Sequence, residues 1–280
     1  MPELAYLNGK FMPIEEAMVP IEDRGYNFGD AVYEVANSYN GGFFGLEEHL
    51  DRLERSLREL SYPPISRDKI REGMLELLKR SEMDRAGVYL QISRGVAPRL
   101  HAYTDVKEPQ IVMIVRGVKD VPAELRENGV SAITVKDIRW GRCDIKTVLL
   151  LPNCMAKQQA LEADAYDAIF VTEEGIVRET TISNVFIVKD GVVVTHPENQ
   201  NILNGITRIM TIDCCRELDL PLEERLYTSD DMFSADEVFF SGTTIEVLGV
   251  VNIDNRPIAD GKVGPVTRRL YEALHAKTPN

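Results

Sequence analysis

The sequence predicts an α+β fold with two domains, and three observations support this prediction. The chain has 280 residues and 44% of them are hydrophobic, enough for one large domain or two modest ones. Short apolar segments separated by Asn-Gly, Glu-Gly or Asp-Gly pairs predict antiparallel hairpins. Other segments repeat apolar residues at spacings of three and four, which predicts helices. Strands and helices do not alternate as a doubly wound parallel sheet requires.

The N-terminal domain is expected at residues 1–119 and opens with strands. The segments AYLNGKFM (5–12) and VYEVANSYNGGFF (32–44) each place an Asn-Gly pair between apolar runs. An Asn-Gly pair in this setting is a strong short-range signal of a β-hairpin. Further along, GVYLQIS (87–93) and PQIVMIVRG (109–117) are rich in branched residues and predict buried strands.

Two helices are expected between these strands. A leucine stripe predicts a helix over 46–60 with one apolar face. The stripe consists of Leu46, Leu50, Leu53, Leu57 and Leu60. Ser66 can cap a second helix that runs to about Arg80. The first domain is therefore expected to be a small α/β unit, a sheet with two helices.

The stretch VKDVPAELRENG is polar, contains Pro122 and separates the two strand-rich parts of the chain. We therefore expect a linker at 120–128 and a larger C-terminal α/β domain at 129–280. Its expected strand segments are VSAITVKDI, the meander DAIFVTEEGIVRETTISNVFIVKDGVVVTHP, EVFFSG and EVLGVVNI. Its expected helices lie around 156–163, after Gly205 and over 265–275.

Composition argues against several classes of protein. The 32 Lys and Arg residues face 45 Asp and Glu residues, so the net charge is -13 and binding to nucleic acid or to an anionic membrane is not expected. No apolar run approaches the roughly 18 residues of a membrane span, and MPELAYLNGK lacks the layout of a signal peptide, so we expect a cytoplasmic protein. The four cysteines have neither paired spacing nor a nearby His. We expect buried thiols, no disulfide and no metal site.

Lys146 is a candidate catalytic residue. It lies in WGRCDIKTVLLLPN, where apolar residues flank it. Burial lowers the pKa of a lysine, and a lysine that loses its proton near neutral pH can attack a carbonyl to form a Schiff base, as pyridoxal phosphate requires. The alternative is a lysine at a strand end whose ammonium reaches solvent.

Glu179 is a candidate partner for the ring nitrogen of such a cofactor, because a protonated pyridine ring is the electron sink. It lies in GIVRETTISNVFIV between apolar segments that could bury it. The alternative is a solvated turn carboxylate beside Arg178.

Two stretches could bind anions. In NILNGITRIMTID, Gly205 permits close backbone approach, and Ile206 and Thr207 open a helix whose first amides can hold a phosphate. Arg52 on the leucine-striped helix could add a guanidinium, although a surface pair with a neighbouring acid is the common alternative.

The second stretch is PRLH, which places Arg99 and His101 two positions apart on a loop stiffened by proline. Arginine offers a planar fork to a carboxylate, and histidine can donate a hydrogen bond. The alternative is a charged loop that binds water and a neighbouring acid.

Taken together, these stretches resemble the fold-type IV (class IV) pyridoxal-phosphate-dependent aminotransferases, and more closely the bacterial D-amino acid aminotransferase family. The resemblance runs over nearly the whole chain. It is carried, in order, by EDRGYNFGDAVYEV, HLDRL, SRGVAPRLH, IRWGRCDIK, AKQQAL, ISNVF, ILNGITR and DGKVG.

This resemblance implies a fold in which a C-terminal pseudo-barrel domain binds pyridoxal 5'-phosphate. It implies that Lys146 is the catalytic Schiff-base lysine and that Glu179 contacts the ring nitrogen. The phosphate ligands that it implies are Arg52, Ile206, Thr207 and Thr243.

The resemblance further implies a trap for the substrate α-carboxylate, made of Tyr33, Arg99 and His101. The substrates implied are a D-amino acid such as D-alanine and a 2-oxo acid such as 2-oxoglutarate. A homodimer is implied, in which the trap loop comes from the neighbouring chain and the active sites lie at the interface.

The sequence departs from this family at two places. Thr180, Thr181 and Ile182 stand where the family tends to be serine-rich, and Gly242 stands where a serine is common. The hydrogen bonds around the cofactor are therefore expected to be fewer. The open alternatives are an (R)-selective amine transaminase, a branched-chain L-aminotransferase, an aminodeoxychorismate lyase and a binding module that keeps the scaffold.

Overall fold

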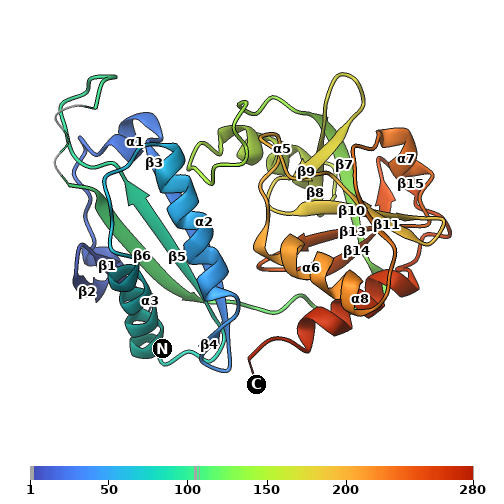
Figure 1. Ribbon diagram of the computed structural model, residues 1–280, viewed down its shortest axis with the longest axis horizontal. Coiled ribbons are helices and arrows are strands. Elements are labelled where there is room, and N and C mark those ends of the chain that lie inside the picture. Colours follow the sequence, from blue (N-terminus) through green and yellow to red (C-terminus); the bar gives the residue numbers. More distant parts are fainter. Residues whose placement is uncertain (1–2, 104–105, 107, 280) are drawn as a thin grey trace. The chain divides into compact units, whose positions relative to one another are not determined.

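The computed structural model describes residues 3–103, 106 and 108–279, and the chain forms two compact units (Figure 1). Unit 1 comprises the chain up to Lys119, the segment Ile145–Leu149 and the last residues of the chain. Unit 2 comprises Asp120–Asp144 and Leu150–Thr278. The interval 120–128, expected as a linker, contains a short helix and lies with unit 2.

The segment Ile145–Leu149 was expected in the C-terminal domain, but it lies with unit 1. Backbone hydrogen bonds explain this placement. The amide of Tyr33 donates to the carbonyl of Lys146 at 3.0 Å, and the amide of Val148 donates to the carbonyl of Ala31 at 3.2 Å. The segment therefore runs along a strand of the first sheet and brings Lys146 to it.

Unit 1 is a six-stranded antiparallel sheet with strand order β2-β1-β6-β5-β3-β4. Its strands are β1 (Leu4–Leu7), β2 (Lys10–Pro13), β3 (Ala31–Tyr39), β4 (Gly42–Phe43), β5 (Ala86–Ser93) and β6 (Gln110–Gly117). Its helices are the 3-10 helix η1 (Ile14–Glu16), α1 (Arg24–Phe28), α2 (Leu46–Glu59) and α3 (Arg67–Ser81). The predicted hairpins, strands and two long helices are confirmed.

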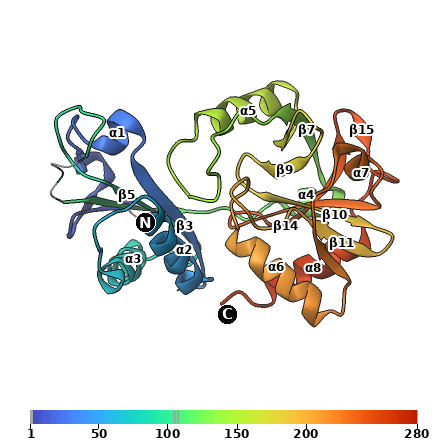
Figure 2. The ribbon, with the colours of Figure 1, turned by 45° about the horizontal axis from the view of Figure 1, so that its top comes forward.

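Helices α2 and α3 lie side by side and pack on the sheet (Figures 1 and 2). The leucine stripe accounts for α2, because Leu50, Leu53 and Leu57 all join the core beneath it. Ser66 caps α3 as expected, and its hydroxyl accepts a hydrogen bond from the amide of Lys69 at 3.3 Å. The core of unit 1 thus lies between this helix pair and the strands.

Unit 2 is a nine-stranded sheet that closes on itself. Strands β10, β13, β14, β7, β8 and β9 pair in that order, and β9 returns to β10 through Glu179 and Asn184. Its strands are β7 (Val130–Lys136), β8 (Asp167–Val171), β9 (Val177–Thr180), β10 (Asn184–Lys189), β11 (Val192–Thr195), β12 (Leu222–Glu224), β13 (Glu237–Gly242), β14 (Glu246–Ile253) and β15 (Arg256–Pro257). The closed sheet confirms the predicted pseudo-barrel.

Five helices surround this barrel: α4 (Ala123–Asn128), α5 (Leu151–Glu162), α6 (Ile206–Glu217), α7 (Ser229–Phe233) and α8 (Pro265–His275). Helices α6 and α8 lie side by side in both views (Figures 1 and 2). Helix α5 begins five residues before its expected start, because Pro152 occupies its first turn, where proline needs no amide partner.

The expectation of buried thiols is only half right. Cys214 and Cys215 are buried on α6, but Cys154 is exposed on α5 and Cys143 is partly exposed. All four thiols are free. Helices in the described part of the chain are too short or too polar to cross a membrane.

Candidate active site

Lys146 lies against β3 in unit 1, where its Nζ is 4.2 Å from the centre of the Tyr33 ring. The backbone hydrogen bond from the amide of Tyr33 to the carbonyl of Lys146 holds the two residues side by side. The Tyr33 ring in turn packs 5.6 Å from the ring of Tyr89 on β5. The structure therefore brings together the candidate catalytic lysine and one candidate substrate-binding residue.

Arg52 lies on α2, almost fully buried, and pairs with Glu34 on β3. Its Nε and Nη2 donate to the two carboxylate oxygens of Glu34 at 2.7 and 2.8 Å. His49, one turn earlier on α2, lies with its Nδ1 2.7 Å from the same carboxylate. Arg52 is thus paired with an acid, but inside the protein rather than at the surface.

The Glu34 carboxylate is charged, which sets its effect on Arg52. Burial alone would raise the pKa of Glu34. The charge and hydrogen bonds of Arg52, together with His49, outweigh burial and hold that pKa well below the usual range. Burial lowers the pKa of His49. A neutral His49 and an ionised Glu34 therefore hold the Arg52 guanidinium in one orientation.

Sequence analysis missed Glu34. Its signal was available, since Glu34 is a single carboxylate inside the apolar run of a predicted strand. Successive residues of a strand point to opposite faces, so the sequence places Glu34 on the face opposite to that of its neighbour Tyr33.

Arg99 and His101 lie on the exposed loop between β5 and β6. Both approach one ring, that of Phe28 at the end of α1. The Arg99 guanidinium carbon is 5.1 Å from the ring centre, and the His101 ring is 5.6 Å from it. The two candidate carboxylate-binding residues thus share a neighbour, whereas the contacts described for Tyr33 are with Lys146 and Tyr89.

Glu179 lies at the closure of the barrel in unit 2 and is 6% exposed, so it is not a solvated turn carboxylate. It forms an ion pair with Arg139 rather than with Arg178. The amide of Leu203 donates to both carboxylate oxygens at 3.0 and 3.2 Å, and the side-chain amide of Asn184 donates to one of them at 3.2 Å. Sequence analysis missed Arg139, although it stands in the quoted segment IRWGRCDIK.

The turn after Glu179 contains the residues that depart from the family pattern. The Thr180 hydroxyl lies 2.7 Å from the hydroxyl of Ser183 and accepts from the amide of Ser183 at 2.9 Å. Thr181 donates to Asp167 at 2.6 Å, whereas Ile182 is exposed. Thr180 thus closes the turn, and Thr181 ties the turn to Asp167 at the start of β8.

Gly242 lies against this turn. A Cβ atom at position 242 would approach the Cβ of Ser183 to 3.2 Å, closer than most such contacts. A side chain at position 242 would therefore require Ser183 to shift by a few tenths of an ångström.

Ile206 and Thr207 open the twelve-residue helix α6 directly after Gly205. A Cβ atom at Gly205 would lie 2.2 Å from the side-chain oxygen of Asn184, so a larger residue there would displace the Asn184 side chain. Asn184 also contacts Glu179. One asparagine therefore joins the start of α6 to the Glu179 carboxylate, at the same end of the barrel.

Thr243 lies in the turn between β13 and β14, which is closed by a hydrogen bond from the amide of Ile245 to the carbonyl of Gly242 at 3.1 Å. Next to it, the hydroxyl of Ser241 is buried with no hydrogen-bond partner in the described structure. A bound anion at this turn would supply an acceptor close to that hydroxyl.

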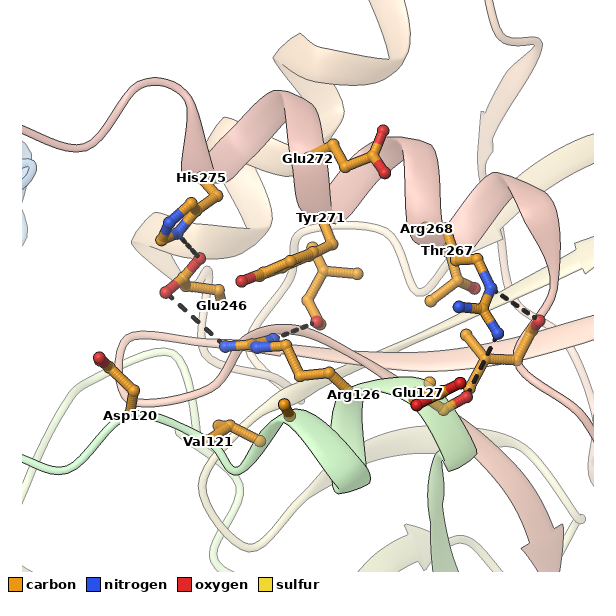
Figure 3. Close-up of a pocket in the computed structure, with 14 residues that line it drawn as sticks. Asp120, Val121, Arg126, Glu127, Glu246, Thr267, Arg268, Tyr271, Glu272 and His275 are labelled. Atoms are coloured by element: carbon orange, nitrogen blue, oxygen red, sulfur yellow. Dashed lines mark hydrogen bonds and ion pairs between the residues drawn. The ribbon is translucent and has the colours of Figure 1, made fainter.

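Arg126 on α4 contacts the backbone that follows this turn, and Figure 3 shows its side chain beside Glu246. Its Nη1 donates to the carbonyls of Ile245 and Val247 at 3.1 and 2.9 Å, and its Nη2 lies 3.7 Å from the carboxylate of Glu246 between them. Glu246 has a left-handed backbone with φ of 55°, which costs free energy for a residue with a side chain. Arg126 therefore stabilises a strained residue three positions after Thr243.

A pocket of about 540 Å³ opens between α4, β14 and α8 (Figure 3). Arg126 lies against the Tyr271 ring at 4.0 Å within it, and His275 lies 2.9 Å from Glu246. The nine predicted site residues are not among those that line it. The pocket borders the start of β14 at Glu246 and Val247.

The residues of each unit fit the expected cofactor. Unit 1 supplies an amine, Lys146, and a buried guanidinium, Arg52, with its counter-ion. Unit 2 supplies a buried carboxylate, Glu179, and the start of a twelve-residue helix that follows Gly205, where a side chain would displace Asn184. These are the groups that an aldehyde, a phosphate and a pyridine nitrogen require.

Comparisons with known proteins agree with this chemistry. The family model described as amino-transferase class IV matches residues 31–253. The D-alanine aminotransferase of Bacillus licheniformis is 44% identical over 268 residues, 95% of this chain and 94% of that protein. The D-alanine aminotransferase of Staphylococcus aureus (strain N315) is 43% identical over 97% of this chain and 96% of that protein.

Solved structures show the same fold. The T.th. branched-chain amino acid aminotransferase with pyridoxamine 5'-phosphate has a TM-score of 0.91 and 29% identity, over 98% of this chain and 94% of that chain. The branched-chain aminotransferase of Thermoproteus uzoniensis with norvaline has a TM-score of 0.87 and 26% identity, over 97% and 93% of the two chains.

Proposed function

The chain belongs to the class IV aminotransferases, and we propose that it is a pyridoxal-phosphate-dependent D-amino acid aminotransferase. It moves the amino group of a D-amino acid such as D-alanine to a 2-oxo acid such as 2-oxoglutarate. The observation that carries this proposal is the 44% identity to a D-alanine aminotransferase over 95% of this chain. The Arg99 and His101 loop agrees with a donor that bears a carboxylate.

Lys146 is the proposed catalytic residue. When bound, pyridoxal phosphate supplies an electron-withdrawing ring that stabilises negative charge at the substrate Cα. The Nζ of Lys146 would serve as the base that takes the substrate Cα proton and as the acid that gives the proton up again to the bound cofactor. The Tyr33 ring beside Nζ limits where that amine can reach.

Three groups are proposed to bind the phosphate. Arg52 donates a guanidinium that Glu34 and His49 hold in place. The first amides of α6, at Ile206 and Thr207, donate from a helix start, and Thr243 adds a hydroxyl.

Glu179 is proposed to hold the proton on the ring nitrogen. Its carboxylate is fixed by Arg139, Leu203 and Asn184, so its position does not depend on a flexible side chain. A fixed acceptor at that nitrogen keeps the ring positively charged.

Tyr33, Arg99 and His101 are proposed to bind the α-carboxylate, with the loop supplied by the second chain of a homodimer. A carboxylate fixed on one side of the ring, with Lys146 on one face, lets only one enantiomer aim its Cα proton at the amine. Residues 98–103 are exposed in the single chain, which agrees with a role in the site of a second chain.

A branched-chain L-aminotransferase is the second candidate, favoured by the folds of the solved structures. The two candidates differ in a half-reaction. With the purified holoenzyme and no oxo acid, D-alanine should change the cofactor absorbance and release about one pyruvate per site, and L-leucine should not. A response to L-leucine alone would favour the second candidate, and no response to either would favour a binding module.

Sharing of the loop has its own test. Lys146→Ala chains, which are expected to be inactive, and Arg99→Ala chains, which are expected to bind D-alanine weakly, should recover D-alanine turnover at low substrate concentration when they are mixed into heterodimers. One of the two hybrid sites then has both residues intact. Verified heterodimers without activity would place the trap in the same chain as Lys146.

A further inference from the structure

The loop that carries Arg99 and His101 has to hold two side chains in a fixed position although it is exposed. Residues 98–103 are all exposed, and Leu100 is 60% exposed. An exposed loop binds a small anion with fixed geometry only if contacts with the rest of the protein hold its backbone in place. The structure shows which residue holds it.

That residue is Arg24, the first residue of α1, which is 3% exposed. Its guanidinium donates to three successive backbone carbonyls of the loop: Leu100 at 2.6 Å, His101 at 3.2 Å and Ala102 at 3.4 Å. Its Nε donates to the carboxylate of Asp30 at 2.9 Å, which balances the buried charge. One planar side chain thus sets the path of the loop backbone on both sides of His101.

Phe28 connects this anchor to the side chains of the loop. The Arg24 guanidinium carbon lies 4.6 Å from the Phe28 ring centre, and Arg99 and His101 approach the same ring. Backbone anchor and anion-binding side chains therefore converge on one aromatic residue of α1.

Asp30 ties Arg24 to the body of unit 1. It also accepts from Nε of Arg94 at 2.8 Å, and the hydroxyl of Tyr62 donates to its backbone carbonyl at 2.8 Å. Arg94 in turn donates to the carbonyl of Leu60 at the end of α2. The position of the loop is thus coupled to the core through a buried charged network.

We propose that Arg24 is a positioning residue that determines the preference for donors with an α-carboxylate, by holding residues 100–102 so that Arg99 and His101 face the anion. The inference rests on the proposed carboxylate trap. Arg24 touches neither substrate nor cofactor and acts through the loop backbone and Phe28.

Arg24→Lys is the informative substitution. Lysine keeps the positive charge, but a compact ammonium cannot bridge three carbonyls and a carboxylate as a planar fork does. Its matched control is Arg85→Lys, because Arg85 also donates to a backbone carbonyl, that of Ser38, and stacks on an aromatic ring, that of Tyr39, away from the loop.

The measurement is the half-reaction of the holoenzyme with D-alanine, together with inhibition by propanoate, which has the carboxylate but no amine. Arg24→Lys should raise the half-saturating D-alanine concentration and the inhibition constant of propanoate roughly tenfold, with a maximal rate within about threefold of wild type. Cofactor affinity should not change. Arg85→Lys should leave both carboxylate measurements unaltered.

Phe28→Leu tests the same inference if Arg24→Lys does not fold. Phe28 is only partly buried, so its replacement should preserve the fold while weakening the support of Arg99 and His101. It should weaken D-alanine and propanoate together. Carboxylate binding within twofold of wild type in the folded variants, or an equal loss of cofactor affinity, would overturn the inference.

Arg99→Ala separates this inference from the proposed function. If Arg99→Ala weakens D-alanine but Arg24→Lys does not, the trap stands and the role of Arg24 is wrong. If Arg99→Ala itself leaves D-alanine and propanoate unaffected, there is no trap at this loop, and both the proposed trap and the proposed role of Arg24 are wrong.

Discussion

The two carboxylate oxygens of Glu34 accept hydrogen bonds from the Nε and Nη2 of Arg52 at 2.7 and 2.8 Å. The two bonds lie side by side and are buried between β3 and α2. This geometry orients the guanidinium in the absence of any bound ligand. The fold also depends on Glu34, because without it the charge of the buried Arg52 would be unpaired, and an unpaired charge inside a protein is strongly destabilising.

Glu34→Gln should therefore lower the free energy of unfolding by about 3–5 kcal/mol, the usual cost of breaking a buried pair. It should also weaken cofactor binding, because Arg52 loses its fixed orientation. Urea unfolding and a cofactor titration measure the two effects. Glu47→Gln, which removes exposed pairs with Arg67 and Arg71, is the control and should change both very little.

The same pair predicts a dependence on pH. The folded-state pKa of Glu34 lies below its ordinary value of 4.5, so its contribution is fully present above that value and is lost as pH falls below it. The free energy of unfolding of the wild type should fall more steeply below pH 4.5 than that of Glu34→Gln. Parallel curves from urea unfolding at several pH values would contradict this assignment.

Lys146→Ala should abolish transamination, because no other group at that position can carry the proton. Borohydride reduction of the wild-type holoenzyme should attach the cofactor to the peptide that contains Lys146, as peptide mass spectrometry can show. Lys157→Ala is a control on α5 that should retain activity. Attachment at another lysine would refute the assignment.

Glu179→Gln should slow proton transfer at the substrate Cα far more than it weakens cofactor binding, because the amide cannot keep the ring nitrogen protonated. Stopped-flow half-reactions with D-alanine at saturation measure the first effect, and equilibrium titration measures the second. Equal half-reaction rates in variant and wild type would count against the role of Glu179.

Arg126→Lys should weaken binding of pyridoxal phosphate roughly tenfold but leave pyridoxal, which lacks the phosphate, nearly unaffected. The reason is that Arg126 holds the carbonyls of Ile245 and Val247 behind Thr243. Arg268→Lys is the control, since Arg268 borders the same pocket but donates to the carbonyls of Val263 and Glu127. If both ligands weaken equally, Arg126 supports only the fold.

Much of the scaffold is predictable because its signals are local. The leucine stripe of α2, the Ser66 cap and the Asn-Gly turns each report on a few neighbouring residues, and the structure confirms all three. Lys146 and Glu179 are candidates because both are charged residues within apolar surroundings, and the structure shows that Glu179 is buried.

The supporting contacts are not local and left no pattern to find. Arg24 binds a carbonyl 76 residues away, and Arg126 binds one 119 residues away. A backbone carbonyl carries no mark of its partner in the sequence. The placement of residues 145–149 beside β3 was missed for a similar reason, since it depends on backbone hydrogen bonds to β3 and on burial of Ile145 in the core of unit 1.

The central claim concerns the handedness of the donor, and one assay tests it most directly. The purified holoenzyme is given D-alanine or L-alanine with 2-oxoglutarate, and pyruvate formation is followed for each enantiomer. We predict that D-alanine is consumed and that L-alanine reacts at least a hundredfold more slowly, the ratio expected when a misplaced Cα proton costs about 3 kcal/mol. Faster consumption of L-alanine would contradict the assignment as a D-amino acid aminotransferase.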